Sequence, residues 1–198
     1  SVPQGLILLG GVNSDVILNS SVAEFKPGAA TGQNLSSEIF GGTLSGIESI
    51  TGTAQKDYLI ASSTGTKLNG NAGNDTLIGG IAVDELSGGT GNDTISAGSE
   101  NDIISGDSGD DIIDGGDGTD SLIGGTGNDT YKFNTNDVDA GEAITEAASG
   151  GTDVVSIVTT TDFENMTAAS FDEIEEIQFS GASQTATFTG NQLTAETL

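Results

Sequence analysis

Large apolar residues recur at every ninth position between Gly70 and Lys132, and an aspartate stands two positions before each of them. The apolar residues are Leu77, Leu86, Ile95, Ile104, Ile113, Leu122 and Tyr131. The aspartates are Asp75, Asp84, Asp93, Asp102, Asp111, Asp120 and Asp129. A short strand that points one side chain inward fits this spacing, and the intervening glycines suit turns that need a positive φ. We therefore predict that two blocks form one coil of a parallel solenoid, with residue i above residue i+18.

The nine-residue repeat also extends back through residues 43–69, where only some of its positions are kept. Asp57 and Leu59 keep both positions, whereas Thr66 replaces an aspartate. Solenoids commonly have atypical terminal repeats, so we predict coils here that stack through apolar side chains. A simple loop is the alternative for residues 61–69.

Short apolar runs separated by turn residues predict β-strands on both sides of the repeats. Before the repeats the apolar positions are Leu6–Leu9, Val16–Leu18, Val22–Phe25, Leu44, Ile47 and Ile50. After them we predict strands at Tyr131–Phe133, around Ile144, and at Val154–Val158, Ile174–Phe179 and Thr185–Thr189, with one helical turn within Phe163–Phe171. The last part also holds Phe133, Phe163, Phe171, Phe179 and Phe188. We expect it to have the larger core and to cap the open end of the roll.

These patterns together predict an all-β protein. Its centre is a parallel β-roll, or β-solenoid, of nonapeptide repeats over residues 52–132. Residues 1–51 form an N-terminal β flank, and residues 133–198 form a C-terminal β-rich cap.

The charge of the chain excludes several classes of function. Thirty acidic residues against 4 basic ones give a formal net charge of −26, which would repel the phosphates of a nucleic acid. No apolar stretch is long enough for a membrane span. Without histidine or cysteine, neither a Ser-His-Asp triad nor thiol catalysis can be built. No acidic residue is set apart from the repeats as a catalytic group, so we predict that the chain is not an enzyme.

The stacked aspartates predict a cation site. Coils one strand spacing apart hold successive carboxylates roughly 4.8 Å from each other, where two charges repel by about 3.5 kcal/mol at an effective dielectric constant near 20. Lys132 is the only basic residue in the seven blocks, so the chain itself offers little compensation. Ca²⁺ accepts six to eight irregular oxygen ligands and would neutralise the row. Without calcium, a flexible acidic linker is the alternative for this segment.

The blocks follow the pattern G-G-x-G-x-D-x-U-x, where U is a large apolar residue, and resemble the RTX, or haemolysin-type calcium-binding, repeat family. The resemblance implies calcium ions between successive coils, shared by aspartates 18 residues apart and completed by turn carbonyls. Asp75, Asp93, Asp111 and Asp129 then form one row, and Asp84, Asp102 and Asp120 the other, which gives about five ions, while a sixth between Asp57 and Asp75 is the alternative. The implied carbonyl ligands are Gly70, Gly73, Gly88, Gly89, Gly91, Gly106, Gly109, Gly115, Gly116, Gly124 and Gly125.

Two blocks depart from the glycine pattern. Ala82 and Glu100 each replace the glycine at position four, and a residue with a Cβ is strained at positive φ. We therefore expect the site shared by Asp84 and Asp102 to be the weakest.

The resemblance also implies a secreted protein, located outside the cell or at its surface. We favour a calcium-binding structural module of a bacterial cell-surface protein, such as an S-layer protein, fibre or adhesin, with self-association or a cell-surface partner. The alternative is the C-terminal export and folding module of an RTX enzyme or toxin that leaves the cell by type I secretion. A free calcium buffer is a third reading, which we favour least because the repeats are architectural.

Overall fold

The structure is a computed structural model. It describes strands at residues 6–10, 14–19, 22–26 and 33–35, and then residues 49–61, 65–146, 150–181 and 183–188 in full, apart from the side chain of residue 168. Within this part of the chain the architecture is all-β, with one short 3₁₀ helix, η1 (Ala168–Phe171).

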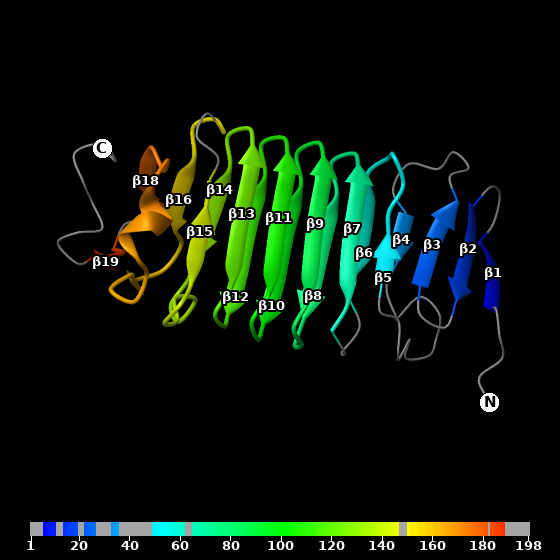
Figure 1. The fold of residues 1–198 in the computed structure, drawn as a ribbon, viewed down its shortest axis with the longest axis horizontal. Helices are drawn as coiled ribbons and strands as arrows, with labels where there is room; N and C mark the ends of the chain where they lie inside the picture. The colour runs from blue at the N-terminus through cyan, green and yellow to red at the C-terminus, as the bar shows by residue number, and fades with distance from the viewer. Residues whose placement is uncertain are drawn as a thin grey trace.

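Two long sheets form an extended stack (Figure 1). The nine-stranded sheet contains, in spatial order, β1 (Leu6–Gly10), β2 (Ser14–Asn19), β3 (Val22–Lys26), β5 (Ser49–Thr51), β7 (Lys67–Ala72), β9 (Glu85–Thr90), β11 (Ile103–Ser108), β13 (Ser121–Thr126) and β15 (Ala143–Thr145). The eight-stranded sheet contains β18 (Glu176–Phe179), β16 (Val154–Ile157), β14 (Thr130–Phe133), β12 (Ile112–Asp117), β10 (Thr94–Ser99), β8 (Thr76–Gly80), β6 (Asp57–Ile60) and β4 (Gln33–Leu35). A third, small sheet pairs β17 (Thr161–Asp162) with β19 (Ala186–Thr187).

Strands from the repeats alternate between the two long sheets and pair in parallel with a step of 18 residues. Leu77 lies beside Ile95, which lies beside Ile113. Leu86, Ile104 and Leu122 follow the same step in the other sheet. Two blocks therefore form one coil, and the predicted parallel β-solenoid is confirmed.

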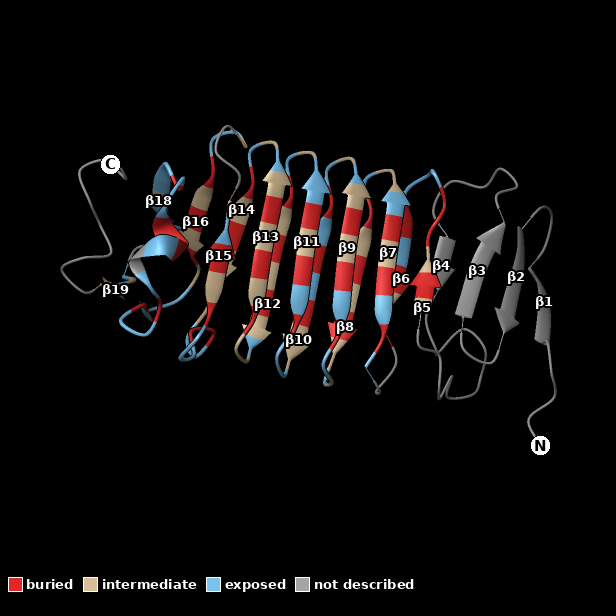
Figure 2. Cartoon of the chain, viewed as in Figure 1, coloured by how far each residue is buried: buried red, intermediate tan, exposed pale blue. Residues whose placement is uncertain are grey.

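The apolar residues of the repeat fill the space between the sheets. Figure 2 shows the resulting buried bands running across successive strands. Each of the seven recurring apolar side chains is at most 1% exposed, and Leu59 and Leu68 of the degenerate blocks are fully buried as well. The residues on either side of them face outward or are half-buried, as in β12. A single inward side chain per strand is thus enough to build this core.

The N-terminal apolar runs form strands as predicted, but they do not all form coils. Strands β1, β2 and β3 pair antiparallel, and only β3 pairs in parallel with the first strand of the solenoid, β5. Strand β4 was not predicted. Leu44 and Ile47 lie outside the described residues. The loop alternative for residues 61–69 is wrong at its C-terminal end, because β7 begins at Lys67 and pairs with β5 and β9.

The C-terminal part continues both sheets. Strands β14, β16 and β18 extend one sheet in parallel, and β15 extends the other. The predicted helical turn is η1. Phe133, Phe163, Phe171 and Phe188 pack as one aromatic cluster with ring centroids 4.9 to 5.8 Å apart. Phe179 does not join this core, because half of its surface is exposed on β18, the last strand of its sheet among the described residues.

Candidate calcium sites

Each of the seven repeat aspartates lies at the end of a turn, immediately before a strand, and is at most 2% exposed. One Oδ1 oxygen accepts the backbone N–H of the residue one coil earlier in the same row. The donors are Asp57 to Asp75 (2.7 Å), Asp75 to Asp93 (2.6 Å), Asp93 to Asp111 (2.7 Å) and Asp111 to Asp129 (2.8 Å) in one row. In the other row they are Thr66 to Asp84 (2.6 Å), Asp84 to Asp102 (2.7 Å) and Asp102 to Asp120 (2.8 Å). These bonds fix every carboxylate in the same orientation.

The second carboxylate oxygen, Oδ2, is buried and makes no hydrogen bond in any of the seven aspartates. Buried polar atoms in proteins are almost always hydrogen-bonded, and a buried charge is expected to be paired or to bind a metal. One buried oxygen without a hydrogen-bond partner in each block therefore indicates that a cation binds there.

Six of the seven free oxygens lie in a small space beside the glycine at position one of their own block, and the seventh block has alanine there. Gly88 illustrates the arrangement: a Cβ added there would lie 2.9 Å from the Gly106 carbonyl oxygen and closer still to Oδ2 of Asp93. The same two kinds of oxygen converge beside Gly70, Gly79 and Gly106. We call this space the cradle of a block. Calcium bonds oxygen at about 2.3 to 2.6 Å, so the cradle suits a cation where a methyl group would clash.

Among the seven blocks between Gly70 and Lys132, position one is occupied by alanine once. Ala97 precedes Asp102 by five residues and is fully buried, so its methyl group fills the space that the other six blocks leave open. The Asp102 carboxylate therefore lacks an open cradle, which is a different weakness from the one that the sequence suggested.

The glycines at positions two and four shape the turns. Gly73, Gly91, Gly109 and Gly127 have φ between 119° and 131°, and a Cβ on Gly91 or Gly109 would clash with the carbonyl oxygen of the same position one coil earlier. Glu100 does adopt the positive φ expected of it, at 76°, but Ala82 does not. The strain predicted at Ala82 is wrong, because the turn of its block takes another path and exposes Ile81 and Val83.

The acidic rows are longer than the sequence predicted. Asp57 begins one row, and beyond Asp129 it continues with Asp153, whose Oδ1 accepts the Asp129 N–H at 2.8 Å. Glu142 extends the other row by accepting the Asp120 N–H at 2.8 Å. Glu175 accepts the Asp153 N–H at 2.6 Å and ends the first row. Sequence reasoning missed the last three because their spacing is 22 to 24 residues instead of 18.

Other acidic residues of the repeats lie outside the cradles. Asp107, Asp110 and Asp117 are exposed and lie on the outer, solvated face of the roll. Asp107 accepts hydrogen bonds from the hydroxyls of Ser87 and Ser105. Asp114 is half-buried instead, and burial raises its pKa.

The buried carboxylates are electrostatically uncompensated. Among the residues that the structure describes, the one ion pair joins Lys67 and Glu85 at 2.6 Å on the surface. Burial, reinforced by neighbouring carboxylates, raises the pKa of Asp75, Asp102 and Asp111 to about 7. Burial raises the pKa of Asp93, Asp120 and Asp129 to about 6. Without a cation, these groups resist ionisation near neutral pH.

The calcium-free protein is therefore expected to become more stable as the pH falls from about 8 to about 5. The raised pKa values mean that the folded state binds more protons than the unfolded state in this range, so the stabilisation is present at low pH and lost as the pH rises through 6 to 7. Far-UV circular dichroism in calcium-stripped buffer measures this as a β signal that grows on acidification. With saturating calcium the trend should reverse, because protons then compete with the metal. A calcium-free β signal that falls on acidification would contradict these pKa shifts.

The repeat strands form two facing sheets, and each sheet is edged by a row of buried carboxylates and glycine cradles. These oxygen atoms are the ligand type of a cation site in a β-solenoid. Residues 66–95 and 96–131 match the family model described as RTX calcium-binding nonapeptide repeat (4 copies). This part of the chain therefore consists of RTX calcium-binding repeats, and the predicted resemblance is confirmed for these residues. No curated protein and no solved structure matches the chain.

The described residues contain no helix that is long and apolar enough to cross a membrane.

Proposed function

We propose that this chain is a calcium-folded structural module, in which ions bound along the two acidic rows hold the coils together. The observation that supports this is that seven buried Oδ2 atoms along the two rows have no hydrogen-bond partners. Carboxylate and carbonyl oxygens are the ligands that calcium takes in proteins, and both kinds line the cradles. The RTX repeats establish calcium binding as the general property of this region.

The seven aspartates are the proposed side-chain ligands. Among the proposed carbonyl ligands, those of Gly70, Gly88, Gly106 and Gly124 lie beside the cradle of the coil before them. Those of Gly73, Gly91 and Gly109 lie in the turns, each beside the glycine at position four of the next coil. Bound calcium would supply the positive charge, while the chain orients one carboxylate oxygen per block through the N–H bond to the other.

The number of ions remains a prediction. About five counts the intervals inside the two predicted aspartate rows. Asp57, Glu142, Asp153 and Glu175 each add one interval to a row, whereas the methyl group of Ala97 occupies one cradle. The expected number is therefore above five, with the weakest site at Asp102.

We further propose that the module belongs to a secreted bacterial surface protein, such as an S-layer protein, a fibre or an adhesin, and has no catalytic role. The exposed carboxylates of Asp107, Asp110 and Asp117 support this, because they offer a second, weaker set of calcium contacts on the outside of the roll. A net charge of −26 keeps chains apart, and bridging calcium would bring them together.

Calcium is then expected to act at two separable concentrations, first folding the chain and later associating it. A calcium titration followed by circular dichroism and analytical ultracentrifugation should show folded monomers before larger assemblies. Monovalent salt alone should not produce the assemblies if calcium bridges rather than screens. A chain that folds fully but stays monomeric at millimolar calcium would favour the alternative, an export and folding module of a type I-secreted RTX protein.

A further inference from the structure

Glu146 occupies a position that is a glycine or alanine in every repeat. Strand β15 pairs with β13 so that Ile144 lies beside Leu122 and Thr145 beside Ile123. One step further, Glu146 stands next to Gly124, which is position one of its block. The seven residues at position one are Gly70, Gly79, Gly88, Ala97, Gly106, Gly115 and Gly124. A large acidic side chain thus replaces the residue that leaves the cradle open.

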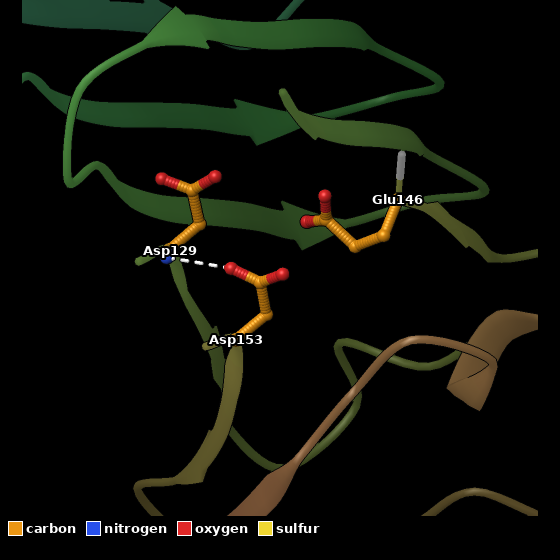
Figure 3. A group of neighbouring side chains, drawn as sticks. All are labelled: Asp129, Glu146 and Asp153. Atoms are coloured by element: carbon orange, nitrogen blue, oxygen red, sulfur yellow. Dashed lines mark hydrogen bonds between the residues drawn. The ribbon is translucent and has the colours of Figure 1, made fainter. Parts of the chain in front are cut away.

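A side chain fits at Glu146 because its sheet ends there. At internal coils a Cβ at position one would clash with the backbone carbonyl of the next coil, as at Gly70 and Gly79. Strand β15 is the last described strand of the nine-stranded sheet, so within the described part of the chain no following strand of that sheet blocks the side chain. Figure 3 shows the Glu146 carboxylate directed toward Asp129 and Asp153.

Three carboxylates meet at this point. Asp129, Glu146 and Asp153 each offer one oxygen, and these oxygens lie within 4.8 Å of one another. Asp129 is fully buried, and its Oδ2 makes no hydrogen bond. Oε2 of Glu146 is likewise buried without a hydrogen bond. Two calcium–oxygen bonds of about 2.4 Å span such a separation, so a single ion can contact all three groups.

The surrounding contacts hold the three carboxylates in place without neutralising them. The Asp129 N–H donates to Oδ1 of Asp153 at 2.8 Å (Figure 3). The hydroxyl of Tyr131 donates to Oε1 of Glu146, which leaves Oε2 free. Both Oε1 and the Asp129 Oδ2 approach the open side of Gly124. Burial raises the pKa of Glu146 to about 7, as expected of a carboxylate that lacks a cationic partner.

We propose that Asp129, Glu146 and Asp153 bind one calcium ion that ties the last repeat to the segment after it. The site joins the start of β14, the end of β15 and the start of β16, and so connects both sheets where the 18-residue step is lost. An internal interval offers two carboxylates, whereas this site offers three. Calcium affinity rises with the number of charged ligands, so this site fills first. The proposal rests on the proposed function and extends it, because it adds Glu146 as a third ligand to the interval between Asp129 and Asp153.

The test compares Glu146→Gln with a matched control, Glu164→Gln, in the full 198-residue chain. Glu164 is exposed and lies outside the acidic rows. Equilibrium dialysis with radioactive calcium should show that E146Q loses the tightest class of ion, because Asp129 and Asp153 alone resemble an internal interval, and that E164Q keeps it. Tyr131→Phe removes the hydrogen bond to Glu146 but keeps all three carboxylates, so its ion number should equal that of the unmutated chain. Equal ion numbers and affinities for E146Q and the unmutated chain would overturn the proposal.

A second measurement keeps all three carboxylates. Terbium binds calcium's oxygen sites and emits when a nearby tyrosine is excited. Because Tyr131 contacts Glu146, the first equivalent of terbium should already give tyrosine-sensitised emission in the unmutated chain, and much less in Tyr131→Phe, which keeps Tyr58 as its one tyrosine. Emission that grows only after several equivalents would contradict early filling of this site. If the unmutated chain binds no calcium at all, the proposed function itself fails. If it binds calcium and E146Q behaves identically, only the terminal site fails.

Discussion

Removal of calcium is expected to convert residues 52–132 from β-structure into a largely disordered chain. The buried carboxylates that would bind calcium in this region have no basic partner among the described residues. Burying an unpaired charge costs several kcal/mol even after relaxation, and each coil contributes one apolar side chain per strand to offset it. Without the cation, the folded state must either keep repelling charges or protonate them.

Far-UV circular dichroism in excess chelator, and then in millimolar calcium, measures this transition. Most of the β signal should appear only with calcium. Magnesium should restore little of it, because magnesium demands strict octahedral geometry and retains its water. A spectrum that is identical in chelator and in calcium would show that the fold does not need the ion.

Alanine at Gly88 is expected to remove calcium binding from its cradle, while glycine at Ala97 should add it. A Cβ on Gly88 would clash with Oδ2 of Asp93 and lie 2.9 Å from the Gly106 carbonyl oxygen. Gly88 does not require a positive φ, and Ala97 already carries a methyl group at the equivalent position, so the added Cβ acts on the cradle and on the Gly106 carbonyl rather than on the turn. The two substitutions therefore test the cradle separately from the turn.

Calorimetric titration should give about one ion fewer for Gly88→Ala and a tighter or additional ion for Ala97→Gly. An ion present at about 100 times its dissociation constant contributes about 2.7 kcal/mol of stability, so the first variant should also need more calcium to fold. Opposite shifts of the two variants would support the cradles as ion sites. Unchanged ion numbers in both would place the calcium elsewhere.

The regular repeats of residues 70–132 predicted most of the fold. A large apolar residue at every ninth position specified the core, because each strand from β8 to β13 buries only one large side chain. The step of 18 residues specified the parallel pairing. Position one could not be interpreted from sequence in the same way. Glycine there resembles an ordinary turn residue, and only the structure shows that its missing Cβ leaves room for oxygen atoms of two coils.

The continuation of the acidic rows was missed where the spacing changed. Glu142 and Asp153 each precede an apolar strand residue by two positions, as the repeat aspartates do. This acid-x-apolar triplet was a usable signal, but it was obscured by longer connections after β14 and β15. Glu146 had no signal of its own, since its role depends on the end of a sheet. Ala82 was misjudged because its turn could change path and avoid positive φ.

Crystals grown in calcium would test the central claim most directly, through an anomalous difference map recorded near the calcium edge. The account predicts peaks beside Gly70, Gly88 and Gly106, each in contact with the free aspartate oxygen of its block, and none beside Ala97. It also predicts one peak among Asp129, Glu146 and Asp153. An ordered roll whose cradles hold no anomalous density would contradict it.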